Sequence, residues 1–389
     1  MGSRIKRDDR ISLIHRLVSH ERLRGLPHWM AVAVSRLVAT AGNGFGLLCT
    51  LAPLMGLVAV VVLSAGPLRP TGPDRLSRAA ASLHSGRARI YTLAWAPDGV
   101  HLAAGSGNGG FTIWDVREHE VDAEFPAPEE TPEAEAGIAA VPLAWSRDGS
   151  ILASRQGSEV VLRDLADQRS RGSFRVPHTT IGCLAFSPDG MELVAGSGDG
   201  SALIWDVQAE RVRATLTHPG PVTGLAFAPD GRSLVSVTSH GTLSLWDSAA
   251  GQLRWSSGTE SPGVKNSVAF SPDGATIATS GARVELWDAA TGRQRRVLKE
   301  EIGFFNTLAY SPDGRRLAAI SSPGGTITLW ETTSFLEVGV YRGRSHGLSL
   351  AFAPDGQTLA SGGLDGMIEL WAVAGDLTPS PSGASSHMR

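Results

Sequence analysis

The sequence predicts an all-β protein built from seven similar units, each of four short strands. One observation is a turn signature ending in Asp-Gly, which recurs every 40 to 43 residues after a first interval of 50. Another is that the residues between these turns alternate between apolar and polar, which is typical of strands rather than helices. The Asp of the signature lies at Asp98, Asp148, Asp189, Asp230, Asp273, Asp313 and Asp355.

The fourth unit shows the pattern most clearly, and it begins at His218. Val222–Ala228 is mostly apolar, whereas Ser233–Thr238 and Thr242–Trp246 alternate, so three strands are expected. Gly251–Ser256 supplies a fourth, outer strand.

The turn between the first two strands of this unit is Ala228-Pro229-Asp230-Gly231. Proline presets φ for the second position, Asp tolerates the third, and Gly adopts the left-handed φ that closes the hairpin. Ser239-His240-Gly241 predicts a second tight turn, between the second and third strands.

Six of the seven units carry a tryptophan at the end of the third strand, and the second carries Arg163 there. An Asp or Glu follows most of these tryptophans. With a period of about 40–45 residues, the chain resembles WD-repeat β-propellers from Leu76 to Trp371. The six tryptophans are Trp114, Trp205, Trp246, Trp287, Trp330 and Trp371.

The resemblance implies a seven-bladed WD-repeat β-propeller, in which stacking around a ring buries both faces of each four-stranded blade. It also implies that a His, a Ser or Thr, an Asp and the Trp tie each blade together. In this chain no unit carries the complete set: the fourth has His218, Ser236 and Trp246, but His240 stands where Asp is expected. Stability is therefore expected mainly from packing of the six tryptophans.

The two ends of the repeat region predict how the ring closes. Leu76–Leu83 precedes the first full repeat, and no convincing fourth strand follows Trp371. The family lets the N-terminal segment complete the last blade, so Leu76–Leu83 is expected to pair with Met367–Trp371.

Residues 1–36 carry eight Lys or Arg against three Asp or Glu. This basic N-terminal segment is either a solvated tail or an amphipathic helix on anionic lipid. Residues 37–68 contain no charged side chain, and Leu47–Ala65 is long enough to cross a bilayer. We interpret residues 37–68 as a single transmembrane helix that anchors the chain; a buried helix of the soluble domain is the alternative.

The orientation of this anchor rests on two indications. The basic residues upstream favour a cytoplasmic N-terminus, although Arg69, Arg75 and Arg78 flank the other side. The resemblance is to bacterial propellers, many of which hang on the outer side of a membrane helix. The expected location is thus a cell membrane crossed once, with the propeller extracytoplasmic.

The remaining boundaries follow from composition. Residues 69–75 are a linker, residues 76–372 the propeller, and residues 373–389 a Ser/Pro-rich tail predicted to be disordered. The first interval is long because of Phe125–Gly137, which is rich in Pro and Glu. That loop is either a solvated spacer or an acidic docking segment for a basic partner.

Charge narrows the choice of partner. The net charge is −3, and because residues 1–36 contribute +5, the rest of the chain carries −8. Such a balance repels phosphate backbones and disfavours nucleic acid. Cys49 and Cys183 do not form a disulfide framework.

Several motifs suggest chemistry but have a structural interpretation. Gly105–Gly110 matches the pattern of dinucleotide-binding loops, yet a strand rather than a helix follows it. The seven Asp-Gly pairs resemble metal ligands, but they lie one per blade and do not converge on one point. The sequence therefore predicts no cofactor, no metal site and no catalytic residue.

The leading interpretation is a membrane-anchored scaffold or sensor without catalytic activity, whose propeller loops bind other proteins. A small-molecule ligand is not expected. The alternative is a propeller hydrolase or ligand-binding protein with its site at the central channel, which inward carboxylates or histidines at one mouth would favour. A third interpretation, a cytoplasmic scaffold held at the inner face of the membrane, differs only in topology.

Overall fold

The computed structural model divides the chain into two units, Met1–Asp74 and Arg75–Arg389. It describes residues 46–48, 61–63, 79–84, 89–107, 109–126, 141–176, 180–258, 265–300, 304–322 and 324–373.

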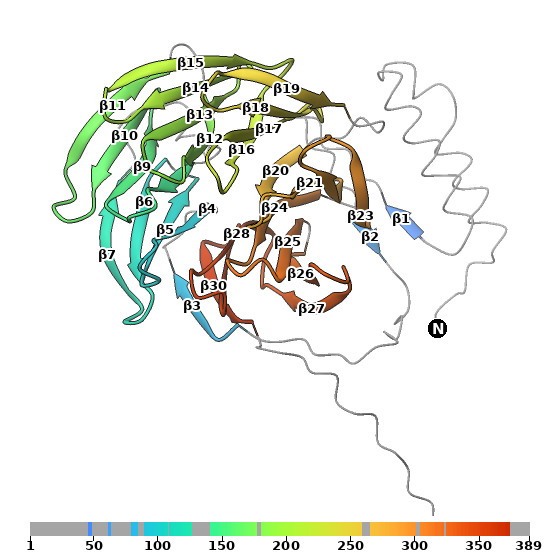
Figure 1. Cartoon of the computed structure of the whole chain (residues 1–389). Helices are drawn as coiled ribbons and strands as arrows, with labels where there is room; N and C mark the ends of the chain where they lie inside the picture. Colours follow the sequence, from blue (N-terminus) through green and yellow to red (C-terminus); the bar gives the residue numbers. More distant parts are fainter. Residues whose placement is uncertain are drawn as a thin grey trace, which may run out of the picture. The chain divides into compact units, whose positions relative to one another are not determined.

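The second unit is a ring of seven four-stranded antiparallel sheets, which we call blades 1 to 7 (Figure 1). The fold is therefore the all-β, seven-bladed propeller that the repeats predict. Blade 1 comprises β4 (Ile90–Trp95), β5 (His101–Ser106), β6 (Phe111–Asp115) and β7 (Glu120–Phe125). Blade 2 comprises β8 (Leu143–Trp145), β9 (Ile151–Gln156), β10 (Glu159–Asp164) and β11 (Ser170–Arg175). Blade 3 comprises β12 (Ile181–Phe186), β13 (Glu192–Ser197), β14 (Ser201–Asp206) and β15 (Arg211–Thr217).

The other four blades repeat this order from the inner to the outer strand. Blade 4 comprises β16 (Val222–Phe227), β17 (Ser233–Thr238), β18 (Leu243–Asp247) and β19 (Gln252–Ser257). Blade 5 comprises β20 (Lys265–Phe270), β21 (Thr276–Gly281), β22 (Arg283–Asp288) and β23 (Gln294–Glu300). Blade 6 comprises β24 (Phe304–Tyr310), β25 (Arg316–Ser322), β26 (Thr326–Glu331) and β27 (Glu337–Arg342). Blade 7 comprises β28 (Gly347–Phe352), β29 (Thr358–Gly363), β30 (Met367–Ala372) and β3 (Ala81–His84).

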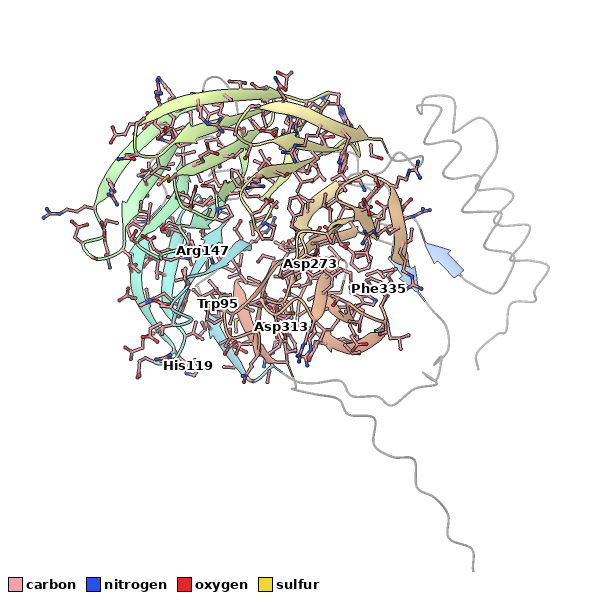
Figure 2. The ribbon with its side chains drawn as sticks, viewed as in Figure 1. Trp95, His119, Arg147, Asp273, Asp313 and Phe335 are labelled. Carbon is pink, nitrogen blue, oxygen red and sulfur yellow. The ribbon has the colours of Figure 1, made fainter. Side chains whose placement is uncertain are left out.

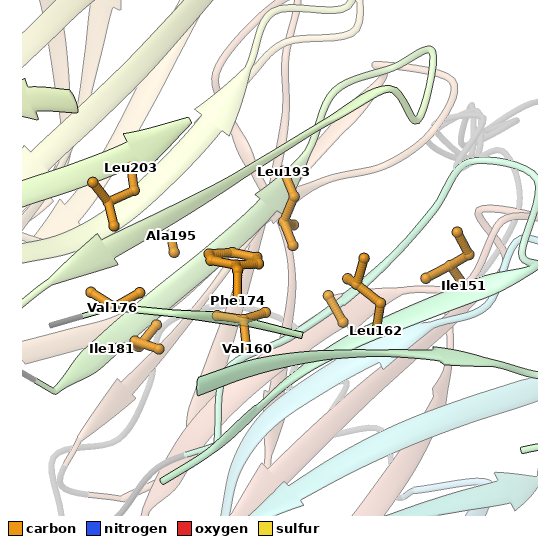
Figure 3. Close-up of a cluster of buried hydrophobic side chains, with 10 residues drawn as sticks. Ile151, Val160, Leu162, Phe174, Val176, Ile181, Leu193, Ala195 and Leu203 are labelled. Atoms are coloured by element: carbon orange, nitrogen blue, oxygen red, sulfur yellow. The ribbon is translucent and has the colours of Figure 1, made fainter. Parts of the chain in front are cut away.

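The hydrophobic core is divided among the seams between neighbouring blades. At the seam shown in Figure 3, Val160 and Phe174 of blade 2 pack with Ile181 and Leu193 of blade 3. Each seam thus buries one face from each of two blades, as the ring architecture requires.

A small residue faces a large one where the inner strands meet. Ala226 of blade 4 and Phe270 of blade 5 are partly buried and pack against the same buried cluster. The sequence repeats this pairing because an alanine precedes the aromatic residue at the end of every inner strand. Further pairs that share a cluster are Ala94 with Trp145, Ala185 with Phe227, Ala269 with Tyr310, Ala309 with Phe352, and Ala351 with Trp95.

The ring closes as the sequence predicts. β3, near the start of the described propeller, pairs antiparallel with β30 at its end, with Ala81 opposite Leu370 and Leu83 opposite Ile368. The N–H of Ala80 extends this pairing by donating to the carbonyl of Leu370 at 2.7 Å. Leu83 is buried in the core between blades 7 and 1.

Five of the six tryptophans are buried, and the sixth differs from expectation. Trp205 is only partly buried, and its ring stacks on Phe174 of blade 2 with the centroids 4.3 Å apart. The tryptophans therefore do not contribute equally to the core. The buried five are Trp114, Trp246, Trp287, Trp330 and Trp371.

Little of the first unit lies within the described residues. There, β1 (Gly46–Leu48) and β2 (Val61–Leu63) pair as a two-stranded antiparallel sheet. These six residues are strand inside the stretch predicted as a transmembrane helix, so the helix is not confirmed. Across the described ranges, no helix has the length and hydropathy to span a membrane.

Other predictions fall outside the described residues. These are the basic segment 1–36, the linker 69–75, residues 127–137 of the acidic loop, and the tail from residue 374. Val373, assigned to the tail by the sequence, is buried, and its N–H donates to the carbonyl of Gln357 at 2.7 Å.

The closing strand provides a test of the fold. Deleting residues 74–83 removes β3 almost entirely and exposes the apolar faces of blades 7 and 1. We expect a loss of several kcal/mol of unfolding free energy, because burying one leucine alone contributes about 2–5 kcal/mol. Urea unfolding of the full chain in detergent measures the loss. Deletion of residues 380–389 is the length-matched control, and equal stability of the two variants would refute closure by β3.

Candidate functional site

Seven equivalent turns join the first and second strands of the blades and form one face of the ring, which we call the turn face. In blade 4 the N–H of Gly231 donates to the carbonyl of Ala228 at 2.9 Å, and Gly231 has φ +71°. Asp230 Oδ1 accepts the N–H of Arg232 at 2.9 Å. Figure 2 shows Arg147, Asp273 and Asp313, from three such turns, around the centre of the ring.

Neighbouring turns touch through a glycine and a proline. A Cβ on Gly274 would lie 3.6 Å from Pro229 Cδ of the preceding blade, so the two turns are in van der Waals contact. The contact repeats around the ring except between blades 2 and 3, where Arg147 replaces the proline and a Cβ on Gly190 would meet nothing within 4 Å. The turn face is therefore a packed rim rather than a set of free loops.

The turn face carries seven exposed aspartates, one from each blade. Where a serine lies two residues earlier, its hydroxyl donates to the carboxylate, as in Ser146 to Asp148 and Ser187 to Asp189, both at 2.6 Å. These serine hydrogen bonds, helped by backbone N–H groups, lower the pKa of both carboxyls. Asp148 and Asp189 are consequently ionised at neutral pH and poorly suited to general acid catalysis.

The seven aspartates do not assemble into a metal centre. Each carboxylate accepts hydrogen bonds within its own turn, as Asp148, Asp230 and Asp313 do. In the part of the chain that the structure describes, no group of three or more His, Cys, Asp or Glu is placed to hold a metal ion.

Inside blade 4, His218, Ser236 and Trp246 form a buried hydrogen-bonded chain. His218 Nδ1 donates to the carbonyl of Gly200 at 3.0 Å, which leaves Nε2 to accept the Ser236 hydroxyl at 2.8 Å. Ser236 Oγ in turn accepts Trp246 Nε1–H at 2.9 Å. Burial lowers the pKa of His218 and keeps the ring neutral. His240 does not take part in this series of hydrogen bonds, and its Nδ1 lies 3.2 Å from the carbonyl oxygen of Pro219.

Blade 5 fills the corresponding place with a buried ion pair, which the sequence analysis missed. Lys265 Nζ contacts Glu285 Oε2 and donates to Thr279 Oγ1 at 3.2 Å. Trp287 Nε1 donates to the same Oγ1 at 3.0 Å, and Nζ lies 4.9 Å from the centroid of its ring. Burial lowers the pKa of Lys265, although Glu285 opposes the shift.

Blade 2 replaces the tryptophan with Arg163 but keeps its hydrogen bond. Arg163 Nη1 donates to Ser154 Oγ at 2.9 Å, as Trp246 donates to Ser236. Its guanidinium carbon also lies 5.0 Å from the ring centroid of Phe125 in blade 1. The guanidinium thus supplies both the donor and the flat surface that an indole would supply.

The structure also explains the glycine-rich motif of blade 1 and the incomplete set of hydrogen-bonding residues in blade 7. Gly105 and Ser106 are the last residues of β5, and the N–H of Ser106 donates to the carbonyl of Gly110, just before β6, at 2.9 Å. In blade 7, Trp371 donates to Ser361 at 2.9 Å, while Asp365 accepts the hydroxyl of Ser345 instead of a histidine.

Comparison with protein families agrees with this geometry. The family described as "WD domain, G-beta repeat" matches residues 80–115, 170–206, 210–247, 253–288 and 337–372. The chain carries WD40 repeats. Each matched WD40 segment begins in or just before the outer strand of one blade and ends on the third strand of the next. This offset explains why the N-terminal β3 completes blade 7.

Three curated relatives are eukaryotic proteins, and each is matched over a part of its length. The APC/C activator protein CDC20 of Saccharomyces cerevisiae is 26% identical, and the match covers 35% of this chain and 21% of that protein. WD repeat-containing protein 18 of Danio rerio is 34% identical, and the match covers 20% of this chain and 18% of that protein. WD repeat and HMG-box DNA-binding protein 1 of Xenopus laevis is 25% identical, and the match covers 35% of this chain and 12% of that protein. This chain therefore spans about a fifth of these relatives or less. The relatives do not support the bacterial origin or the N-terminal anchor that the sequence resemblance suggested.

The tryptophan hydrogen bond can be isolated with two matched variants. Trp246 Nε1 is bonded to Ser236, whereas Trp114 Nε1 is buried without a hydrogen-bond partner in the described residues. Replacing either tryptophan by Phe removes a similar side-chain volume, but only Trp246→Phe removes a hydrogen bond. We expect Trp246→Phe to cost about 1–2 kcal/mol more in urea unfolding than Trp114→Phe. Equal costs would show that the bond to Ser236 contributes nothing.

Proposed function

We propose that this protein is a membrane-anchored scaffold or sensor module that binds other proteins through its propeller and has no catalytic activity of its own. The observation that carries the proposal is the turn face, where exposed aspartates stand on turns that pack against one another. Pre-organised charged surfaces of this kind favour specific association, because little conformational entropy is lost on binding.

The proposed anchor is residues 37–68, preceded by the basic segment 1–36 and joined by the linker 69–75. A stretch of 32 residues without a charged side chain supports this assignment, since each charge inside a bilayer is costly. We propose that the N-terminus is cytoplasmic and that the propeller lies on the outer side.

The proposed partners are proteins rather than nucleic acids. The chain outside the basic segment carries −8, which would repel a phosphate backbone. One relative has a DNA-binding name, but only 12% of its length is matched.

The aspartates at one mouth of the ring are also what a ligand-binding or hydrolytic propeller would need. Against this alternative, each carboxylate already serves its own turn, and hydrogen bonds lower the pKa of Asp148 and Asp189. Elemental analysis of the purified full chain discriminates between the two functions. Stoichiometric calcium or zinc would favour the hydrolase.

Membrane attachment has a direct test. The full chain is expected to stay in the membrane pellet after alkaline carbonate, whereas a variant lacking residues 37–68 is expected in the supernatant. In intact spheroplasts, protease should digest a C-terminally tagged propeller while cytoplasmic controls survive. Protection until lysis would reverse the proposed orientation, and release of the full chain by carbonate would refute the anchor.

A further inference from the structure

A groove opens at the seam between blades 4 and 5, beside the turn face. Its volume is about 550 Å³, which is within the range of protein sites that hold a ligand or a side chain. The residues that matter for its chemistry are Asp230, Arg254, Trp255, Phe270 and Asp273.

The apolar part of the groove is held in place by the blades. Trp255 Nε1 donates to the carbonyl of Ala289 at 3.0 Å, which fixes the indole of blade 4 to blade 5. A Cβ on Gly292 would lie 2.7 Å from this ring, so the glycine provides space for it. Phe270 packs in the same seam as Trp255. The groove therefore exists before any partner arrives.

The charged part comes from two neighbouring turns. Asp230 Oδ1 accepts the N–H of Arg232 at 2.9 Å, and Asp273 Oδ1 accepts that of Ala275 at 3.0 Å. In the described chain, neither Oδ2 makes a hydrogen bond to protein. Each carboxylate thus has one oxygen committed to its turn and one available to a partner.

Arg254 does not neutralise these carboxylates. Its guanidinium is already bound to Asp247 Oδ2 at 2.6 Å and to Ser233 Oγ at 2.9 Å. Asp230 and Asp273 form no ion pair within the described chain, and Arg295, whose charge acts on Asp273, is itself bound to Asp288.

We propose that this groove binds a lysine or arginine side chain from a basic segment of a partner protein. The aliphatic stem would lie on Trp255 and Phe270, and the cationic head between Asp230 and Asp273. Long basic side chains combine an apolar stem with a charged head, and cations bind favourably to indole faces. The charge of −8 outside residues 1–36 complements such a segment. This inference rests on the proposed function and names the partner chemistry.

The test uses photocrosslinking, which detects weak binding. The probe is a Gly/Ser peptide with three arginines and one benzophenone residue, added to the full chain in detergent. The matched probe has citrulline, which keeps the shape of arginine without its charge. We expect the arginine peptide to crosslink at the seam of blades 4 and 5, and the citrulline peptide to crosslink about tenfold less.

Two double variants separate the groove from the acidic turn face as a whole. Asp230→Asn with Asp273→Asn keeps the oxygen that each turn needs and is expected to reduce crosslinking about tenfold. Asp313→Asn with Asp355→Asn removes two charges from turns outside the groove and is expected to change the yield less than about twofold. Equal loss in both variants, equal yield with citrulline, or crosslinks elsewhere would overturn the proposal.

A separate measurement distinguishes this result from failure of the proposed function. Native electrophoresis of detergent-solubilised membranes reports whether the full chain resides in a complex with other proteins. The groove proposal predicts that Asp230→Asn with Asp273→Asn dissociates this complex while the control pair does not. A complex that survives both pairs refutes the groove but keeps the interaction module. A chain that migrates alone refutes the interaction module itself.

Discussion

The structure depends on one constraint: a blade with two apolar faces needs a neighbour on each side. The seven seams meet this need only if the ring is complete, and completion requires β3 to pair with β30. Leu83 shares a buried cluster with residues of blades 1 and 7, so the closing strand serves both sides of the junction. Glycine–proline contacts also join the turns of every neighbouring pair of blades except blades 2 and 3, including blades 7 and 1 where the ring closes.

Within this frame, three blades build a buried polar group around a hydroxyl on the second strand. The hydroxyl accepts a hydrogen bond from the third strand, donated by Trp246 in blade 4, Trp287 in blade 5 and Arg163 in blade 2. Blade 4 adds neutral His218, whose Nε2 accepts from the hydroxyl, and blade 5 adds the ion pair of Lys265 and Glu285. The common requirement is therefore a third-strand donor facing the hydroxyl, whereas the additional polar partner varies. Blade 1 has Ala104 in place of the hydroxyl, and among the described residues Trp114 Nε1 has no hydrogen-bond partner.

Most of the fold could be predicted from the sequence because its signals are local. Pro229-Asp230-Gly231 specifies its turn from adjacent residues, and the repeat period places the closing strand. The ion pair and the groove could not be predicted in this way. Lys265, Thr279 and Glu285 come from three strands, and the groove joins Asp230 and Trp255 to Asp273 of the next blade. Such sites depend on how the blades stack.

Native-state hydrogen exchange of the full chain in detergent tests the central claim that the ring is one closed, cooperative unit. The amides of β29 and β30 are compared with those of β17, which lies in a blade remote from the closure. We predict that both sets of amides exchange with the same opening free energy, which equals the free energy of global unfolding. If β29 and β30 exchange with an opening free energy several kcal/mol lower than that of β17, the rest of the ring is stable without its closure. That result would contradict the claim that the ring is one cooperative unit.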